Sequence, residues 1–279
     1  MHCLSGLGLA VAAEIDIGQS DAAAPRAPAA HFSPREDHQL INLTFVIAGH
    51  TPGAPPPTTY KDAARRFAQS YVKHDAGYPH RLVLIDSNGG LTPDIAALFD
   101  DIPHEVISYR GNGWDIGAHQ FAALTMPADD WIMCFSSWAH FKQAGWLKAF
   151  VDARGIYGNG LYGSTSSLER NMHIRGTGLF TKCGIIHRYP YGVNSREESF
   201  EFEAGDNSLT TWCLNKGYGV WLVTPQATVP VAQGRELPDV FRRGNQSNVW
   251  TFDKHTDLYE VAALNEKEAL AGKADGNGL

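Results

Sequence analysis

The chain has 279 residues, of which 43% are hydrophobic and 19% charged, and its formal net charge is −7 at pH 7. This acidic balance argues against a nucleic-acid-binding protein that works through bulk positive charge, because neutralising phosphates requires a surplus of cations. The four cysteines form no Cys-x-x-Cys pair. A disulfide scaffold or a zinc ribbon is therefore not expected, and a cytoplasmic protein is the simpler interpretation.

The first 38 residues contain no segment with a hydrophobic period. An apolar stretch at 3–13 lacks the basic residues that precede the core of a signal peptide, and acidic residues follow it at once. Residues 17–38 are rich in Ala, Pro, Ser and Asp, which favours a disordered leader over residues 1–38. No stretch reaches the roughly 20 apolar residues that span a bilayer. Peripheral association with a membrane is compatible with this sequence.

Apolar runs and helical periodicity alternate between residues 40 and 155. Short apolar runs predict buried strands, and apolar residues spaced three and four apart predict helices. The expected strands are 40–48, 81–85, 106–109 and 131–135, and the expected helices are 60–74, 93–99, 117–126 and 143–153. This alternation predicts an α/β fold with an open, mostly parallel, Rossmann-like sheet and helices on both faces.

The second half of the chain is less regular. A helix is expected at 206–215, because Asp206 opens a helix-start signal, and a strand is expected at 220–225. We expect one sheet-based domain over residues 39–230. The polar segment 231–279 is interpreted as a C-terminal extension that packs on or near the ligand cleft.

Polar residues follow each predicted strand, where an open parallel sheet binds its ligands. An Asp in a glycine-rich turn can bind a base or a ribose, and a Trp beside an Asp suits a sugar or base through stacking and a carboxylate hydrogen bond. Alternatively, Asp86 closes a turn and Asp115 caps a helix. The candidate ligand-binding residues after the four strands are His50, then Asp86, Ser87 and Asn88, then Asn112, Gly113, Trp114 and Asp115, then Ser136 and Ser137.

An acidic segment at 195–210 carries the candidates for a general base. The run Phe200-Glu-Phe-Glu203 is interpreted as extended chain, in which both glutamates share one face. Glu203 or Asp206 would then accept a proton from an acceptor. The alternative is an acidic loop in which Asp206 caps the following helix. Arg175, in Arg-Gly-Thr-Gly, would present a guanidinium to a phosphate, or else belongs to a tight turn.

Three of these features together resemble nucleotide-sugar glycosyltransferases of the GT-A fold, namely Asp86, the Gly111–Gly117 loop and the stretch Glu203–Pro225. The similarity is to glycosyltransferase family 2 and to rhamnan-synthesis transferases, and it covers about residues 40 to 225. It implies that Asp206 is the catalytic base, with Glu203 the second candidate, and that Asp86 contacts the nucleobase. It also implies inverting hexosyl or deoxyhexosyl transfer from a nucleotide-diphospho-sugar to a glycan or lipid-linked acceptor, as in surface polysaccharide synthesis.

The resemblance fails at one place. The family holds a divalent metal, Mn²⁺ or Mg²⁺, with an Asp-x-Asp motif directly after the fourth strand, and this chain has Ser136-Ser137-Trp138 there. Serine is a poor substitute for the carboxylates that such hard cations prefer. Either other residues hold the metal, whose ligands stay unassigned, or Arg175 and Lys182 neutralise the diphosphate. A third alternative is a non-catalytic nucleotide- or carbohydrate-binding protein that retains the fold.

Overall fold

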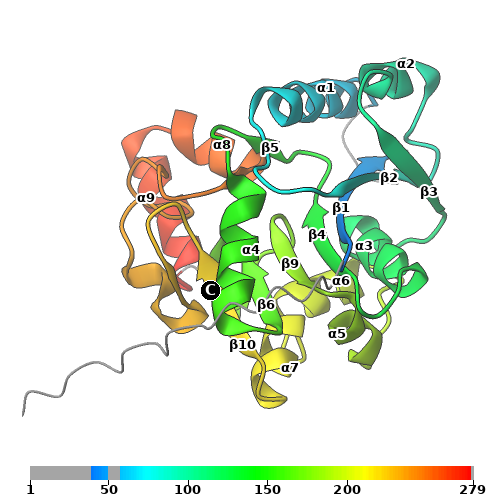
Figure 1. The fold of residues 1–279 in the computed structure, drawn as a ribbon. Coiled ribbons are helices and arrows are strands. Elements are labelled where there is room, and N and C mark those ends of the chain that lie inside the picture. Colours follow the sequence, from blue (N-terminus) through cyan, green and yellow to red (C-terminus); the bar gives the residue numbers. More distant parts are fainter. Residues whose placement is uncertain (1–38, 50–56, 278–279) are drawn as a thin grey trace, which may run out of the picture. The chain divides into compact units, whose positions relative to one another are not determined.

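The computed structural model describes residues 39–49 and 57–277, and the expected leader 1–38 lies outside them (Figure 1). The described residues form an eight-stranded sheet in the order β11-β10-β6-β9-β4-β1-β2-β3, and two pairs of short strands. The sheet contains β1 (Ile41–Ala48), β2 (Arg81–Ser87), β3 (His104–Tyr109), β4 (Trp131–Phe135), β6 (Gly160–Gly163), β9 (Leu179–Lys182), β10 (Gly219–Val223) and β11 (Thr228–Pro230). The short pairs are β5 (His140–Phe141) with β12 (Thr251–Phe252), and β7 (Ser166–Ser167) with β8 (His173–Ile174).

The sheet is mostly parallel. Strand β1 pairs in parallel with β2 and β4, β2 with β3, and β6 with β10. Strand β9 runs antiparallel between β4 and β6, and β11 is an antiparallel edge strand on β10. The predicted α/β class and mostly parallel sheet are therefore confirmed, with β9 as an inserted strand of opposite direction.

Helices cover both faces of the sheet, as predicted. Successive β1 side chains point to opposite faces, so Leu43 and Phe45 join one apolar cluster and Val46 the other. The first cluster packs against α1 (Pro57–Lys73), α2 (Pro93–Ala96), η1 (Ala97–Phe99) and α4 (Trp146–Tyr157). The second packs against α3 (Trp114–Thr125), α5 (Cys183–Arg188), α6 (Arg196–Ala204) and α7 (Leu209–Asn215).

Aromatic packing holds the first face together. The Phe45 ring stacks on Phe67 of α1 with the centroids 3.7 Å apart, and Phe141 stacks on Trp146 of α4 at 4.0 Å. Fully burying side chains of this kind contributes about 1.5–3 kcal/mol each. This packing holds the central strands in place, and with them the start of each loop that follows their carboxyl ends.

The extended conformation expected for residues 200–203 is wrong, because the segment belongs to helix α6. Ser195 is the N-cap of that helix, and its side chain accepts a hydrogen bond from the Glu198 backbone N–H. Ser-x-x-Glu is a helix-start signal, and it outweighs a two-residue alternation of Phe and Glu. Helix α7 begins later than expected, with Ser208 rather than Asp206 as its N-cap.

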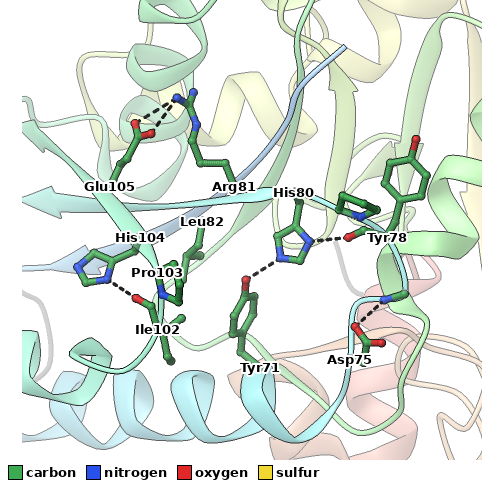
Figure 2. Close-up of a pocket in the computed structure, with 12 residues that line it drawn as sticks. Tyr71, Asp75, Tyr78, His80, Arg81, Leu82, Ile102, Pro103, His104 and Glu105 are labelled. Carbon is green, nitrogen blue, oxygen red and sulfur yellow. Dashed lines mark hydrogen bonds and ion pairs between the residues drawn. The ribbon is translucent and has the colours of Figure 1, made fainter. Parts of the chain in front are cut away.

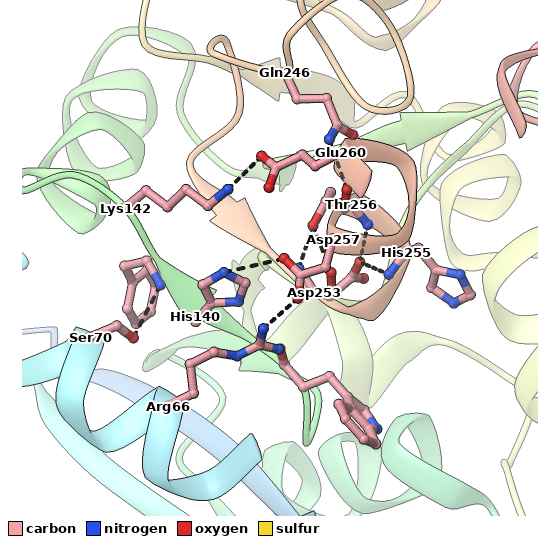
Figure 3. A network of polar contacts seen from close by, with 12 residues as sticks. Arg66, Ser70, His140, Lys142, Gln246, Asp253, His255, Thr256, Asp257 and Glu260 are labelled. Carbon is pink, nitrogen blue, oxygen red and sulfur yellow. Dashed lines mark hydrogen bonds and ion pairs between the residues drawn. The ribbon is translucent and has the colours of Figure 1, made fainter. Parts of the chain in front are cut away.

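The C-terminal segment consists of η2 (Val231–Glu236), α8 (Lys254–Val261) and α9 (Leu264–Ala274). Asp257 of α8 forms an ion pair with Arg66 of α1 and lies 3.4 Å from His140 of β5, while Glu260 pairs with Lys142 (Figure 3). These contacts hold α8 against α1 and β5, in the segment that follows β4. None of the described helices combines the length and the hydropathy needed to cross a membrane.

Candidate functional site

A cleft lies where the strand order of the sheet reverses. The chain adds β2 and β3 on one side of β1 and then places β4 on the other side, and ligands of open α/β sheets bind at such a switch point. The cleft comprises an inner cavity of about 170 Å³ and an outer cavity of about 490 Å³. Both are lined by Trp114, Asp115, Ile116, Arg175, Glu203, Lys254 and His255.

The loop after β3 places Asp115 in this cleft. Gly113 is the N-cap of α3, and its backbone N–H donates to the Tyr109 hydroxyl at 3.1 Å. A Cβ at Gly113 would lie 2.3 Å from the carbonyl oxygen of Val193, so the close packing requires glycine there. Trp114 has a φ of 51°, a left-handed conformation that a bulky residue rarely adopts. Helix α3 begins at Trp114, three residues earlier than predicted. Asp115 lies in its first turn rather than capping it.

Asp115 faces the loop that follows β4. Its carboxylate accepts long hydrogen bonds from the Ser137 backbone N–H at 3.4 Å and from the Ser137 hydroxyl at 3.5 Å. Burial raises the pKa of Asp115 to about 6, against the opposing Ser137 hydrogen bonds and with a small contribution from the negative charge of Glu203. A carboxyl group with this pKa can hold or release a proton near neutral pH.

Glu203 enters the cleft from helix α6. Its Oε1 accepts a hydrogen bond of 2.8 Å from the Gly176 backbone N–H, and its side chain lines both cavities. Asp206 lies in the turn after α6, where it is exposed and accepts a hydrogen bond from Asn171 at 3.0 Å. Asp206 lines neither cavity. Of the two predicted carboxylates, the structure therefore brings only Glu203 to the cleft.

Cationic side chains surround the same space. Arg175 pairs with the buried Asp253 at 2.9 Å and packs over the Phe241 ring. Burial opposes ionisation of Asp253, but Arg175 and the hydrogen bonds at the start of α8 lower its pKa to about 2. Arg196, Arg242 and Lys254 also line the outer cavity. In residues 39–49 and 57–277, no carboxylate oxygen lies within 4.0 Å of the charged nitrogens of Arg196, Arg242 or Lys254.

The residues of the cleft do not fit a divalent metal site of the Asp-x-Asp type. After β4, the Ser136 hydroxyl accepts a hydrogen bond from Thr177 at 2.7 Å and Ser137 faces Asp115. Mg²⁺ and Mn²⁺ prefer several oxygen ligands, mainly carboxylates and carbonyls. Within the described residues, no group of three or more His, Cys, Asp or Glu side chains is placed to hold a metal.

Lys182, a second cation considered for the diphosphate, is far from this role. It pairs with Asp129, which precedes β4, and it lies opposite Trp131 at the start of that strand. Its ammonium group is therefore at the amino edge of the sheet. Of the two proposed cations, Arg175 lies at the carboxyl edge of the sheet and lines the inner cavity.

The candidates after β2 lie outside both cavities. Asp86 accepts a hydrogen bond from the Leu91 backbone N–H at 3.0 Å and pairs with Arg110 at 2.7 Å, which is the turn-closing arrangement left open as an alternative. Asn88 donates to the Gly111 carbonyl at 2.9 Å. Ser87 is buried in the strand end, and Asn112 is exposed. His50 lies outside the described residues.

Several residues of the cleft were not among the site residues predicted from the sequence. His119 lies one helical turn after Asp115 and lines the inner cavity, with its Nδ1 2.9 Å from the Thr44 hydroxyl. The Asp-x-x-x-His spacing on one helix face was the signal available for it. Phe241, Arg242 and the start of α8 come from the C-terminal segment, which folds back across the sheet. Local patterns do not encode such long-range contacts.

A larger hollow of about 760 Å³ lies at the opposite edge of the sheet, near the starts of β2 and β3 (Figure 2). Two of its titratable side chains are bonded within the protein. The His80 ring lies 2.6 Å from the Tyr71 hydroxyl and 2.7 Å from the Tyr78 carbonyl, while Arg81 pairs with Glu105 at 3.1 Å. The hollow therefore has its arginine and His80 already bonded within the protein.

Comparison of the sequence with protein-family models and with curated proteins gives no match. Solved structures with similar folds include S. aureus TarS, at 10% identity and a TM-score of 0.46 over 81% of this chain and 46% of that one. HddC from Yersinia pseudotuberculosis is 14% identical, with a TM-score of 0.39 over 58% of this chain and 83% of HddC. Mouse xyloside xylosyltransferase 1 is 10% identical, with a TM-score of 0.37 over 63% of this chain and 73% of that one. This chain spans about half the length of TarS. At this level of likeness, the functional assignment has to rest on the cleft.

Proposed function

We propose that the chain is an inverting glycosyltransferase that transfers a hexosyl or deoxyhexosyl group from a nucleotide-diphospho-sugar to a hydroxyl acceptor. The observation that carries this proposal is the meeting of Asp115 and Glu203 in one cleft at the switch point of the sheet, with Arg175 and Lys254 lining the same space. The carboxylates can act as a general base and can accept hydrogen bonds from sugar hydroxyls. The cations suit a diphosphate leaving group.

Glu203 is the base in this proposal. The acceptor hydroxyl attacks the anomeric carbon, the bond from that carbon to the phosphate oxygen breaks, and the nucleoside diphosphate leaves with the bonding electrons. The hydroxyl proton passes to Glu203. One oxygen of Glu203 is held by the Gly176 N–H, and no hydrogen bond from the described residues engages the other. The second oxygen can therefore accept the proton of the substrate hydroxyl, on a side chain whose orientation is fixed.

The inner cavity, at about 170 Å³, suits the sugar of the donor. Tyr60 and Trp138 lie with their ring centroids 5.8 Å apart beside this cavity, and Trp114 lines it too. Aromatic rings of this kind stack on a base or a sugar. Asp115 accepts hydrogen bonds from sugar hydroxyls, and the Lys254 ammonium neutralises phosphate charge. We derive no step through a metal, since the side chains after β4 do not provide its ligands.

A matched pair of aromatic substitutions tests the location of the donor. Ser136→Phe fills the inner cavity, and His104→Phe adds the same side chain to the hollow at the amino edge. Thermal unfolding is measured with UDP-, GDP-, dTDP- and CMP-sugars, because a ligand that binds only the folded state raises the apparent stability. We expect one donor class to raise the melting temperature of the wild type and of H104F, and not that of S136F.

Two results would overturn this proposal. No stabilisation of the wild type by any donor class would remove the nucleotide-sugar site, and equal stabilisation of S136F would move it out of the inner cavity. Stabilisation without transfer or hydrolysis, over a set of glycan and lipid-linked acceptors, would favour the alternative of a binding protein without catalysis.

A further inference from the structure

The outer cavity contains a buried arginine that has no carboxylate partner. Arg242 is 6% exposed and lines this cavity beside Phe241. Its Nε has no hydrogen-bond partner, and its Nη2 lies 3.1 Å from Nδ1 of His255. Within the described part of the chain, no carboxylate oxygen lies within 4.0 Å of its charged nitrogens. A buried charge without a partner is costly, and an anionic ligand would remove that cost.

The contact with Arg242 fixes the proton on His255. A guanidinium can only donate hydrogen bonds, so Nδ1 of His255 must accept. Burial, followed by the charge of Arg175, lowers the pKa of His255 to about 4, so the ring is neutral near pH 7. A neutral imidazole with an accepting Nδ1 carries its proton on Nε2. His255 therefore brings a hydrogen-bond donor to the cleft, next to the Lys254 ammonium.

The backbone at Arg242 is held in a fixed, unusual conformation. Its φ is 51°, in the left-handed region that non-glycine residues rarely adopt. The Arg242 backbone N–H donates to the side-chain oxygen of Gln246 at 2.9 Å. Gln246 is fully buried and donates in turn to the Thr256 carbonyl at 3.0 Å (Figure 3). The start of α8 and the loop of Arg242 are thereby tied to each other.

The position of Glu203 assigns different substrates to the two cavities. It lines both, whereas Ser136 and Ser137 line only the inner cavity and Arg242 only the outer one. A base must touch the acceptor hydroxyl next to the donor sugar. With the donor sugar in the inner cavity, the acceptor extends into the outer one, where the other carboxylates are Asp115 and Glu169.

This inference rests on the proposed glycosyl transfer. We propose that the acceptor carries an oxyanion, a phosphate or a carboxylate, which binds Arg242 and His255 in the outer cavity. The guanidinium offers paired N–H donors that match either oxyanion. The exposed Phe200 ring lines this site and suits the apolar face of a sugar.

Calorimetric binding of simple probes tests this assignment. The probes are D-glucose 6-phosphate, D-glucuronate and D-glucose, together with the nucleotide that binds best among UDP, GDP, dTDP and CMP. The variants are Arg242→Met and the control Arg188→Met, since Arg188 is exposed and lines neither cavity. We expect at least one charged probe to bind at least tenfold more tightly than glucose. R242M should lose at least tenfold in affinity for it, as expected for a hydrogen bond to a charged group.

R242M should bind the nucleotide within twofold of the wild type, and R188M should bind every probe as the wild type does. R242M should also unfold at the same temperature or higher without ligand, because an uncompensated buried charge is removed. Arg242→Lys provides a second variant that keeps the charge but not the paired donors, and its loss of affinity should be intermediate. The relative affinity for glucose 6-phosphate and glucuronate identifies the oxyanion.

Equal affinity for glucose and for both charged probes would overturn the anion site. A loss of nucleotide affinity in R242M, with the charged sugars unaffected, would assign Arg242 to the donor diphosphate and overturn the acceptor role. Arg242-dependent binding of a charged sugar by a protein that binds none of the nucleotides would keep the anion site and overturn the glycosyltransferase.

Discussion

The cleft and the hollow at the two edges of the sheet differ in how their charges are partnered. The hollow at the amino edge is the larger, at about 760 Å³, yet its Arg81 is paired with Glu105 and its His80 is bonded on both ring nitrogens. The cleft at the carboxyl edge is smaller and contains Arg242 and Lys254 without ion-pair partners in the described chain. Cations without ion-pair partners, rather than volume, therefore mark the place where an anionic ligand is expected.

The largest expected effect on stability lies beneath the cleft, at Asp253. This side chain is 3% exposed, pairs with Arg175 and caps helix α8. Asp253→Ala leaves a buried guanidinium uncompensated, which costs about 3–5 kcal/mol. We expect that loss in the free energy of unfolding, measured in urea at pH 7. A loss below about 1 kcal/mol would mean that Arg175 finds another partner.

The stabilising effect of Asp253 should depend on pH in the acid range. Its pKa is lowered to about 2 in the fold, from 3.8 without these contacts. The stabilisation is therefore present above about pH 4 and is lost as the pH falls through about 2. Asp253→Asn should flatten the stability profile between these values, as seen by circular dichroism. An unchanged acid transition would contradict the pairing with Arg175.

Asp115 should show the opposite dependence on pH. Burial raises its pKa from 3.8 to about 6, so the folded state binds this proton more tightly than the unfolded chain does. Ionisation therefore reduces stability as the pH rises from about 4 to about 6. Asp115→Asn should be more stable than the wild type at pH 7.5 by on the order of 3 kcal/mol. The advantage should vanish at pH 4, and lower stability of D115N at pH 7.5 would contradict the account.

The smallest expected effect is in the hollow. The Arg81–Glu105 pair is exposed to solvent, and its partners can be hydrated when separated. Glu105→Gln should change the free energy of unfolding by about 1 kcal/mol or less, and donor binding should be unchanged. A change in nucleotide affinity in E105Q would join the hollow to the functional site and break the comparison.

The sequence predicted those elements whose signals are local. Strand β4 at Trp131–Phe135 agrees with its apolar run, and the glycines of the Gly111–Gly117 loop indicate the turn that packs around Tyr109. The alternation of Phe and Glu over Phe200–Glu203 predicts extended chain, whereas the Ser195–Glu198 helix-start signal gives helix α6. Choosing between Glu203 and Asp206 required three-dimensional placement, since both lie in one acidic segment.

Other parts of the site depend on contacts between distant segments. Asp253 reaches Arg175 across 78 residues of chain, as their pairing shows. Arg242 lines the cleft together with Trp114 and Glu203, which lie far from it along the chain. Hydrophobic period and turn chemistry describe neighbours along the chain. They cannot assign a partner to a cation, and so the unpaired state of Arg242 could not be predicted.

The central claim is that Glu203 is the base, and a single-turnover comparison of Glu203→Gln with Asp206→Asn tests it most directly. The glutamine of E203Q can still accept from the Gly176 N–H, so the fold should persist. With the donor that binds in the thermal screen, and water or a hydroxyl acceptor, we predict a rate about 10²- to 10⁴-fold lower for E203Q. D206N should stay within twofold of the wild type. A wild-type rate in E203Q, or an equal loss in D206N, would contradict the assignment.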